Sequence, residues 1–255
     1  MLNDLKDKVV LITGSSTGIG AATALAFGRL GARVAVHCHS SRAPAEEVVR
    51  QIQAGGAQAC LLQADVRDSG QCRQLVEDTV KTFGRIDILI NNAGAMVQRV
   101  PIEAITDALF DEVVHLNVRS AMVCSAAAVE AMRRQGGGGA IINVTSVAAR
   151  HGGGAGASLY AGSKGFVSTM TRGLAKELAK DKIRVNAVAP GVITTPFHDR
   201  FSTPAMLEAF RGTIPMSRLG APEECAGAFV YLASEQMSGY VTGQIMEVNG
   251  GQYMP

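Results

Sequence analysis

Tyr160 and Lys164 are the residues whose types and spacing could most readily perform chemistry together. Four positions apart in a helix, their side chains would lie on one face, one turn from each other. A phenol has a pKa near ~10 and is by itself a poor acid or base at neutral pH. A neighbouring ammonium favours the phenolate and lowers that pKa, which suits proton transfer to or from an alcohol or ketone oxygen. This spacing is frequent by chance, so other segments must support the interpretation.

The size and composition of the chain fit one large α/β domain. It has 255 residues, of which 47% are hydrophobic and 18% charged, so it can bury a large core. The formal net charge is +2, from 24 basic and 22 acidic side chains. This balance gives no support for nucleic-acid binding.

Cysteine usage and the first residues predict a cytoplasmic protein. The cysteines are scattered, odd in number and without a Cys-x-x-Cys motif, which is typical of reduced thiols: Cys38, Cys60, Cys72, Cys124 and Cys225. Residues 1–8 are too polar for a signal peptide, and no apolar run approaches the ~18 residues of a membrane span. His37 and His39 share a strand face, but two histidines without further ligands predict no metal site.

A glycine-rich turn follows the first predicted strand, residues 8–12, and precedes an alanine-rich helix over residues 21–30. The order of strand, glycine-rich turn and helix presents free backbone N–H groups to a phosphate. Gly14 would permit the tight turn, while Gly18 and Gly20 would let a pyrophosphate and the helix approach closely. A lone glycine cluster is weak evidence, and a turn without a ligand is the alternative.

The end of the second predicted strand, residues 31–37, bears on the choice of dinucleotide. In dinucleotide sites an acidic residue here holds the ribose 2′-hydroxyl, but this chain has Cys38 at that position. The residues that follow offer a histidine, hydroxyls and a guanidinium, which would suit a 2′-phosphate: His39, Ser40, Ser41 and Arg42. The alternative is a polar loop that opens a helix over residues 44–54.

Strands and helices alternate along the rest of the chain, which predicts βαβ units and a Rossmann-type doubly wound parallel sheet of about seven strands. The further predicted strands are residues 59–63, 86–90, 140–144, 183–188 and 244–248. The further predicted helices are residues 69–83, with Ser69 as a cap, 103–134, 158–180 and 222–233. One domain over residues 1–255 accounts for the chain, with ligands bound at the carboxyl ends of the strands.

Two segments stand out from this pattern. Residues 118–132 are apolar almost all round, which predicts a helix buried on two sides, by the sheet and by another subunit. Residues 196–217 are the least periodic long stretch, and we expect them to form a mobile substrate loop beside the crevice.

Six motifs occur in an order that resembles classical short-chain dehydrogenases/reductases. They are Thr13-Gly-x-x-x-Gly-x-Gly20, Asn91-Asn-Ala-Gly94, Asn117, Ser146, Tyr160-x-x-x-Lys164 and Pro190-Gly191. The resemblance covers essentially the whole chain. Enoyl reductases use a longer Tyr–Lys spacing and resemble this chain less.

The resemblance implies a role for each of four residues. Tyr160 would be the proton donor in reduction and the base in oxidation, and Lys164 would lower the pKa of Tyr160 and hold the nicotinamide ribose. Ser146 would hydrogen-bond the substrate oxygen as charge develops on it. Asn117 would position a water that links Lys164 to solvent.

The resemblance also implies a nicotinamide cofactor, for which the missing acid and Arg42 favour NADP over NAD. Thr17, however, stands where NADP-binding members often carry a basic residue. The implied cofactor contacts are Gly14, Ser16, Thr17, Gly18, Ile19, His39, Ser40, Ser41, Arg42, Asp65, Val66, Asn92, Gly94, Tyr160, Lys164, Ile193 and Thr195.

The expected function is hydride transfer between NADP(H) and a ketone or secondary alcohol, as in a 3-oxoacyl-type or general carbonyl reductase. A sugar or polyol dehydrogenase is the alternative within the family. Arg133 and Arg134 could meet an acidic carrier protein, although arginines at a helix end are more often solvated. A non-catalytic dinucleotide-binding sensor is the alternative of another class. A metal-dependent alcohol dehydrogenase would need Cys/His clusters that the chain lacks, and the family commonly forms homotetramers.

Overall fold

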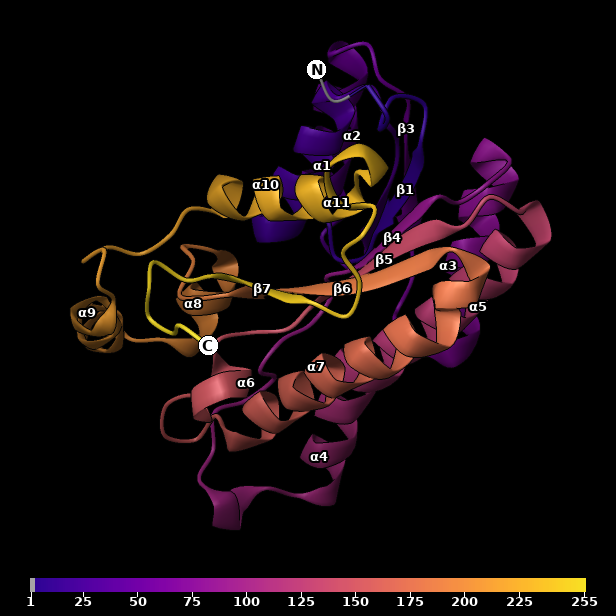
Figure 1. Ribbon diagram of the computed structural model, residues 1–255. Helices are drawn as coiled ribbons and strands as arrows, with labels where there is room; N and C mark the ends of the chain where they lie inside the picture. Colours follow the sequence, from indigo (N-terminus) through magenta and orange to yellow (C-terminus); the bar gives the residue numbers. More distant parts are fainter. Residues whose placement is uncertain (1–2) are drawn as a thin grey trace.

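Seven parallel strands form one sheet in the computed structural model, which describes residues 3–255 (Figure 1). The strands are β1 (Val9–Ile12), β2 (Arg33–Cys38), β3 (Ala59–Gln63), β4 (Ile88–Asn91), β5 (Gly139–Val144), β6 (Ile183–Pro190) and β7 (Ile245–Val248). Their order is β3-β2-β1-β4-β5-β6-β7. The predicted Rossmann-type fold and its seven strands are therefore confirmed.

The strand order reverses at β1: β2 and β3 follow on one side of it, and β4 to β7 follow on the other. Leu11 is in register with Ala35 of β2 and with Leu89 of β4. All four residues of β1 are fully buried, as expected for a central strand covered on both faces. A crevice at such a switch point is where open parallel sheets bind ligands.

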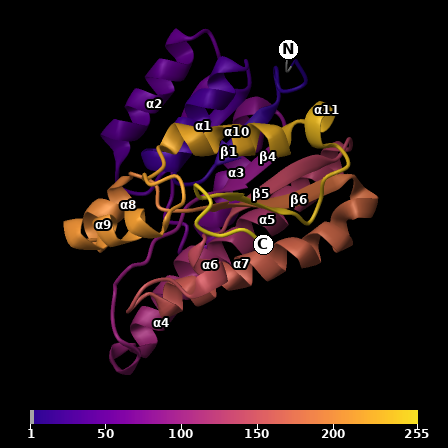
Figure 2. The same ribbon diagram turned by 60° about the vertical axis from the view of Figure 1, so that its left-hand side comes forward.

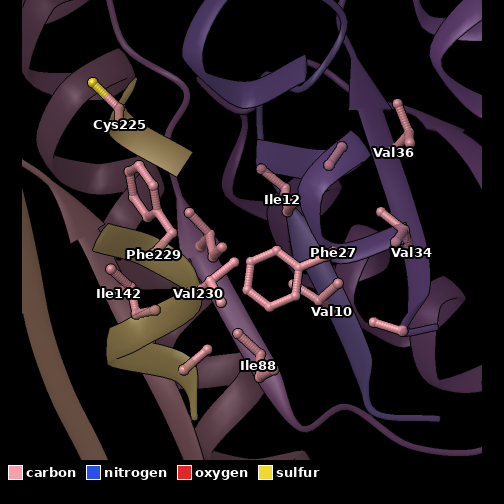
Figure 3. Packing of buried hydrophobic residues seen from close by; sticks show 14 of the residues in the cluster. Val10, Ile12, Phe27, Val34, Val36, Ile88, Ile142, Cys225, Phe229 and Val230 are labelled. Carbon is pink, nitrogen blue, oxygen red and sulfur yellow. The ribbon is translucent and has the colours of Figure 1, made fainter. Parts of the chain in front are cut away.

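Helices α1 (Gly18–Arg29), α2 (Arg42–Ala54) and α10 (Pro222–Ala233) cover one face of the sheet (Figure 1). Phe27 of α1 and Phe229 of α10 are fully buried and pack with Val34, Val36 and Ile142 of the strands (Figure 3). Burying an aromatic side chain of this kind contributes on the order of 1.5–3 kcal/mol. This packing holds α1 against the sheet, with Phe27 in its last turn.

Helices α3 (Ser69–Phe83), α5 (Ser120–Gln135) and α7 (Ser158–Leu178) cover the opposite face. Cys72, Cys124 and Ile141 are fully buried in this second layer of the core. The prediction that Ser69 caps α3 is wrong, because the carboxylate of Asp68 accepts the N–H of Gln71 instead. An aspartate caps as well as a serine, and its charge also suits the helix N-terminus.

A buried amide network joins two strands to two helices near the carboxyl ends of the strands. Asn91 of β4 donates to Asn143 of β5 at 2.9 Å and to Ser125 of α5 at 3.0 Å. Asn143 in turn donates to Thr171 of α7 at 2.9 Å. Buried hydrogen-bond networks specify one arrangement of the core, although the Asn91 side-chain oxygen in this network has no partner within the described residues. Here the network joins the middle of α7, the helix that carries Tyr160 and Lys164, to the strands.

The predicted helix over residues 103–134 is interrupted in the structure. It consists of a 3₁₀ turn (Ile102–Ala104), α4 (Asp107–Val114), a π-helical turn (His115–Arg119) and α5. Asn117 lies in the π-helical turn and is buried. Such turns frequently occur at functional sites.

The segment over residues 196–217, predicted as a loop, contains α8 (Pro196–Phe201) and α9 (Pro204–Thr213). Each helix begins with proline, and the hydroxyl of Thr203 caps α9 by accepting the N–H of Met206. The sequence reasoning also missed two short helices, α6 (Ala148–His151) and α11 (Glu235–Ser238), while a 3₁₀ turn (Ala179–Asp181) ends the α7 region. Within residues 3–255, none of the helices has the length and apolar character needed to span a membrane.

Candidate active site

A cavity of about 840 Å³ lies along the carboxyl ends of the strands and reaches from the end of β2 to helices α8 and α9. These two helices lie together beside the strand ends in both views (Figures 1 and 2). Seventeen of the predicted residues line the cavity: Gly14, Ser16, Thr17, Gly18, Ile19, His39, Ser40, Ser41, Asp65, Val66, Asn92, Gly94, Ser146, Tyr160, Lys164, Ile193 and Thr195. Arg42 and Asn117 are not among the lining residues.

The glycine-rich turn after β1 has the backbone conformation that its sequence requires. Gly14 and Gly18 have φ angles of 63° and 56°, which other residues adopt only with strain. No side chain caps the first turn of α1 and no acidic residue lies in it. The N–H groups of this turn and its positive dipole end are therefore suited to an anion such as a pyrophosphate.

A buried histidine, His37, holds this turn in place. Its Nδ1 accepts the N–H of Gly14 at 2.8 Å, so the proton lies on Nε2, which is 3.0 Å from the carbonyl of Ala64. Burial lowers the pKa of His37, although the Ala64 carbonyl favours the charged form. The sequence analysis treated His37 only as a rejected metal ligand and missed this role. His37 is a polar residue near the end of the mostly apolar strand β2, and this position could have indicated a buried hydrogen-bonding role.

Asn92 fastens the turn to the end of β4. Its side-chain amide donates to the carbonyls of Thr13 at 2.8 Å and Gly14 at 2.9 Å. Gly20 packs directly beneath, since a Cβ added there would lie 2.4 Å from the Gly14 oxygen and 2.6 Å from the Asn92 amide nitrogen. The expected close approach of helix and turn at Gly20 is thus present.

The end of β2 differs from the expectation for Cys38 and Arg42. Cys38 is 1% exposed and belongs to the core, because alternate strand residues point to opposite faces. The guanidinium of Arg42 donates to Glu46 at 2.8 Å and to Gln63 at 3.4 Å and does not line the cavity. Glu46 lies four residues after Arg42, and this helical spacing already indicated an ion pair in the sequence.

The acidic side chains that line the cavity are both ion-paired with one arginine. Arg67 lies 2.8 Å from Asp65 and 2.9 Å from Glu112. Hydrogen bonds from Arg67 lower the pKa of Asp65, so this carboxylate is ionised at neutral pH. The positive charge of Arg67 balances its negative charge. The ring of His39 is also 3.8 Å from Asp65.

The Tyr160 phenol and the Ser146 hydroxyl lie together at the centre of the cavity. Burial raises the pKa of Tyr160 to about 12, and the hydrogen bond with Ser146 partly opposes this rise. The Lys164 amine lies 5.9 Å from the Tyr160 ring centroid and donates to the Val144 carbonyl at 2.9 Å, so the lowering of the Tyr160 pKa by Lys164 stays a prediction. Burial lowers the pKa of Lys164 itself to about 8.

Asn117 lies directly behind this group. Its side chain donates to the carbonyl of Ala95 at 2.8 Å and accepts the N–H of Ala95 at 3.0 Å. A Cβ added to Gly94 would lie 2.7 Å from the Asn117 oxygen and 2.9 Å from the Lys164 nitrogen. Gly94 therefore keeps a small space open beside both polar groups.

On the far side of the cavity, the segment after β6 meets the glycine-rich turn. Ile193 is 4% exposed and forms an isolated bridge with Gly220. A Cβ added to Gly18 would lie 3.2 Å from the Thr195 methyl group. Residues 193–195 and the start of α1 thus form opposite walls of one channel.

Aromatic side chains from α8 and α9 enclose the remaining part of the cavity. The ring centroid of Phe197 is 5.6 Å from that of Tyr160 and 5.0 Å from that of Phe201. Phe210 of α9 packs near His198 at 6.5 Å between centroids. The sequence analysis placed substrate specificity in this region but named none of these rings.

The residues fit a nicotinamide dinucleotide. The α1 terminus has no side-chain cap, Gly14 and Gly18 have positive φ angles, and one cavity joins this turn to Tyr160. In the described part of the chain, no group of three or more His, Cys, Asp or Glu side chains could hold a metal ion.

Comparisons with known proteins agree with this geometry. The family model described as "Enoyl-(Acyl carrier protein) reductase" matches residues 14–252. The chain is 38% identical over 254 residues to the 3-oxoacyl-[acyl-carrier-protein] reductase of Synechocystis sp., with 98% of each chain covered. It is equally identical, with the same coverage, to an L-rhamnose 1-dehydrogenase (NAD(P)(+)) of Sphingomonas sp..

A similar solved structure is that of the NADH-dependent reductase A1-R′ complexed with NAD. It has a TM-score of 0.89 and 40% sequence identity, and the match covers 100% of both chains. The chain therefore belongs to the short-chain dehydrogenase/reductase family and is an oxidoreductase that acts on carbonyl or alcohol groups.

Proposed function

We propose that the chain reduces a ketone to a secondary alcohol with NADPH, and that Tyr160 is the proton donor. The observation that carries this proposal is the position of the Tyr160 phenol beside Ser146 within a cavity that continues to the glycine-rich turn of α1. When bound, the reduced nicotinamide supplies a hydride to the carbonyl carbon. The phenol supplies a proton to the carbonyl oxygen, so the product is the neutral alcohol.

A phenol with a pKa of about 12 is fully protonated at neutral pH and is suited to act as an acid toward a developing alkoxide. Ser146 is placed to donate to the same oxygen, which would stabilise its charge as it develops. Lys164, near its own pKa of about 8, can exchange a proton at neutral pH. The Asn117 oxygen and the Lys164 amine both border the small space beside Gly94, and we propose that the proton is replaced through this space.

We propose NADPH because the end of the channel formed by β2 carries donors and no unpaired carboxylate. His39, Ser40 and Ser41 line it, while Asp65 is neutralised by Arg67. A free carboxylate there would repel a 2′-phosphate. The similar reductase described with NAD makes NADH the alternative, which the cofactor comparison below decides.

Carrier-protein substrates receive less support than free carbonyl compounds. Arg133 is ion-paired with Asp181 at 2.6 Å and Arg134 lies 3.9 Å from Glu130, so neither stands free for an acidic partner. The four-residue spacing of Tyr160 and Lys164 argues against enoyl reduction. A sugar or polyol dehydrogenase remains the second candidate, supported by the similarity to the rhamnose enzyme.

The proposed assembly is a homotetramer. Phe110 of α4, Met122 of α5 and Phe166 of α7 are each about half exposed. Helix α4 contacts α7, and the π-helical turn that leads into α5 contacts both of them. Apolar side chains on adjacent helices favour association with another copy. Sedimentation at micromolar concentration tests this proposal, and a monomer would contradict it. The five unpaired cysteines suit a reducing compartment, so we propose a cytoplasmic location.

The function is tested by incubating the protein with a library of ketones, aldehydes, acyl thioesters and polyols, with NADPH and NADH in separate reactions. Absorbance of the reduced nicotinamide follows turnover, and mass spectrometry identifies the product. We expect a secondary alcohol formed with NADPH. Tight NADPH binding without turnover of any compound would favour a non-catalytic sensor.

A further inference from the structure

The charges that line the cavity are distributed unevenly between its two ends. At the cofactor end, defined by the glycine-rich turn, β2 and residues 65–67, the lining carboxylates of Asp65 and Glu112 are ion-paired with Arg67. At the substrate end, defined by Arg99, residues 151–157 and helices α8 and α9, the lining includes Arg99 and Arg200 but no carboxylate. The substrate end therefore carries positive charge that the described part of the chain leaves unbalanced.

Arg99 is half-buried and held in position by backbone groups. Its Nε donates to the carbonyl of Phe201 at 3.2 Å, and its Nη1 donates to the carbonyl of Ala155 at 2.6 Å. A guanidinium has five N–H donors, so these two bonds leave three for a ligand. Burial lowers the pKa of Arg99, and no carboxylate lies within ion-pairing distance of it among residues 3–255.

The other charged groups near Arg99 do not neutralise it. His198 on α8 has a lowered pKa, chiefly because of burial and then because of Arg99 itself, so it is neutral at pH 7. Asp199 lies on the same helix but does not line the cavity. Arg200 is exposed and forms no hydrogen bond or ion pair with residues 3–255. A half-buried guanidinium without a counter-ion is costly unless a ligand supplies one.

The path from Tyr160 to Arg99 is lined by aromatic rings. Phe197 lies against Tyr160, Phe201 lies against Phe197, and the backbone of Phe201 holds Arg99. We infer that the substrate is an oxo acid, whose carbonyl lies at Tyr160, whose carbon chain contacts Phe197 and Phe201, and whose carboxylate binds Arg99 with help from Arg200. This inference rests on the proposed function at the carbonyl end. The carboxylate itself takes no part in the reaction.

Carboxylate binding can be measured separately from turnover. Straight-chain alkanoates, their methyl esters and alkyl phosphates are titrated by calorimetry into the protein loaded with NADP⁺. Charge-assisted hydrogen bonds contribute about 1.5–3 kcal/mol each, so we expect alkanoates to bind at least about tenfold more tightly than their esters. Esters that bind as well as alkanoates, or phosphates that bind better, would overturn the inference.

The variants separate charge from structure. Arg200→Gln removes a charge without removing any hydrogen bond, and Arg99→Lys keeps the charge but loses the fork that grips a carboxylate. Both should lower alkanoate affinity severalfold and leave ester affinity unchanged. Arg29→Gln, an exposed arginine at the end of α1 and away from the cavity, is the matched control and should change neither. An unchanged alkanoate affinity in both cavity variants would overturn the inference.

Turnover then distinguishes the two proposals. A series of straight-chain oxo acids and their methyl esters is assayed with NADPH, and we expect kcat/KM to favour the acids by at least about tenfold. Equal turnover of acids and esters would leave the reductase function intact and remove the carboxylate site. Alkanoate binding without reduction of any carbonyl would keep the carboxylate site and contradict the reductase function.

Discussion

The two ends of the cavity are built in different ways. At the cofactor end, the side chains of His37 and Asn92 hydrogen-bond the backbone of Gly14, and the carboxylates are already paired. At the substrate end, Phe197 and Phe210 come from two short helices, and the arginines lack counter-ions.

The cofactor end uses a kind of recognition that members of the family can share, whereas the substrate end uses side chains that can differ from one member to another. A pyrophosphate is recognised by backbone N–H groups, so its site requires glycines at a few fixed positions. A substrate is recognised by side chains, and any of several combinations can serve. The following predictions test this contrast, beginning with the largest expected effect.

Gly20→Ala should weaken cofactor binding strongly. The added Cβ would lie 2.4 Å from the Gly14 carbonyl oxygen, which must move together with the turn that Asn92 fastens. Overpacking of this kind costs roughly 1–3 kcal/mol, and loss of the turn geometry should weaken NADPH binding by ~100-fold. Calorimetric titration with NADPH measures this loss of affinity.

Gly227→Ala is the matched control, because Gly227 lies in the interior of α10 with open space around its Cα. It should bind NADPH normally and gain about 1 kcal/mol in stability. Normal NADPH binding by Gly20→Ala would show that the cofactor end tolerates more movement than we infer.

Lys164→Met should change how stability depends on pH. The unfolded chain keeps this ammonium charged up to about pH 10.4, whereas the native pKa is about 8. Between these values the unfolded state binds more protons, so the wild-type free energy of unfolding rises with pH relative to that of the variant. The relative gain should be on the order of 2–3 kcal/mol, measured by urea unfolding at about pH 7 and about pH 10.

The control is Lys81→Met, which replaces an exposed lysine of α3 and should show no such trend. A stability difference between Lys164→Met and the wild type that stays constant with pH would mean that Lys164 is not desolvated as described.

Ser40→Asp should reverse the cofactor preference. Ser40 is exposed at the rim of the cavity, and a carboxylate there would repel the 2′-phosphate while accepting ribose hydroxyls. We expect kcat/KM with NADPH to fall by at least about tenfold relative to that with NADH. Ser40→Asn, of similar size but neutral, should keep the NADPH preference, and an equal loss in both variants would rule out the electrostatic explanation.

Arg42→Gln should have the smallest effect, although the sequence alone assigned Arg42 to the phosphate. Its guanidinium is held by Glu46 and Gln63, outside the cavity, so NADPH kinetics should change by less than about threefold. Glu46→Gln, which releases the guanidinium, should raise the NADPH preference. A tenfold loss of kcat/KM with NADPH but not with NADH in Arg42→Gln would show that Arg42 does contact the 2′-phosphate.

The sequence predicted the sheet and the cofactor end more fully than the substrate end. The strand–glycine–helix order and the spacing of Tyr160 and Lys164 are local patterns, and these are present as predicted. The contact between His37 and Gly14 joins residues 23 positions apart, so a polar residue in an apolar strand marks His37 but no local pattern identifies its partner. The placement of Phe197 and Arg99 depends on how α8 packs over the cavity, which is a tertiary property.

Three features of the site have local causes that the sequence analysis did not use. Cys38 ends β2, where an acidic residue was found missing, and strand alternation turns its side chain into the core. Arg42 is ion-paired with its helical neighbour Glu46, and its contact with the 2′-phosphate stays a prediction. Burial raises the pKa of Tyr160, so the lowering of that pKa by Lys164 stays a prediction.

The most direct test of the central claim, that Tyr160 donates the proton in a reductase, is the Tyr160→Phe variant assayed with NADPH and the best ketone of the library. The ring and its contact with Phe197 are kept, while the transferable proton is lost. General acid catalysis contributes roughly 10²–10⁴-fold, so kcat should fall by at least a factor in that range. The dissociation constant of NADPH, measured by calorimetry, should stay unchanged. Turnover close to that of the wild type would contradict the role of Tyr160 and with it the proposed mechanism.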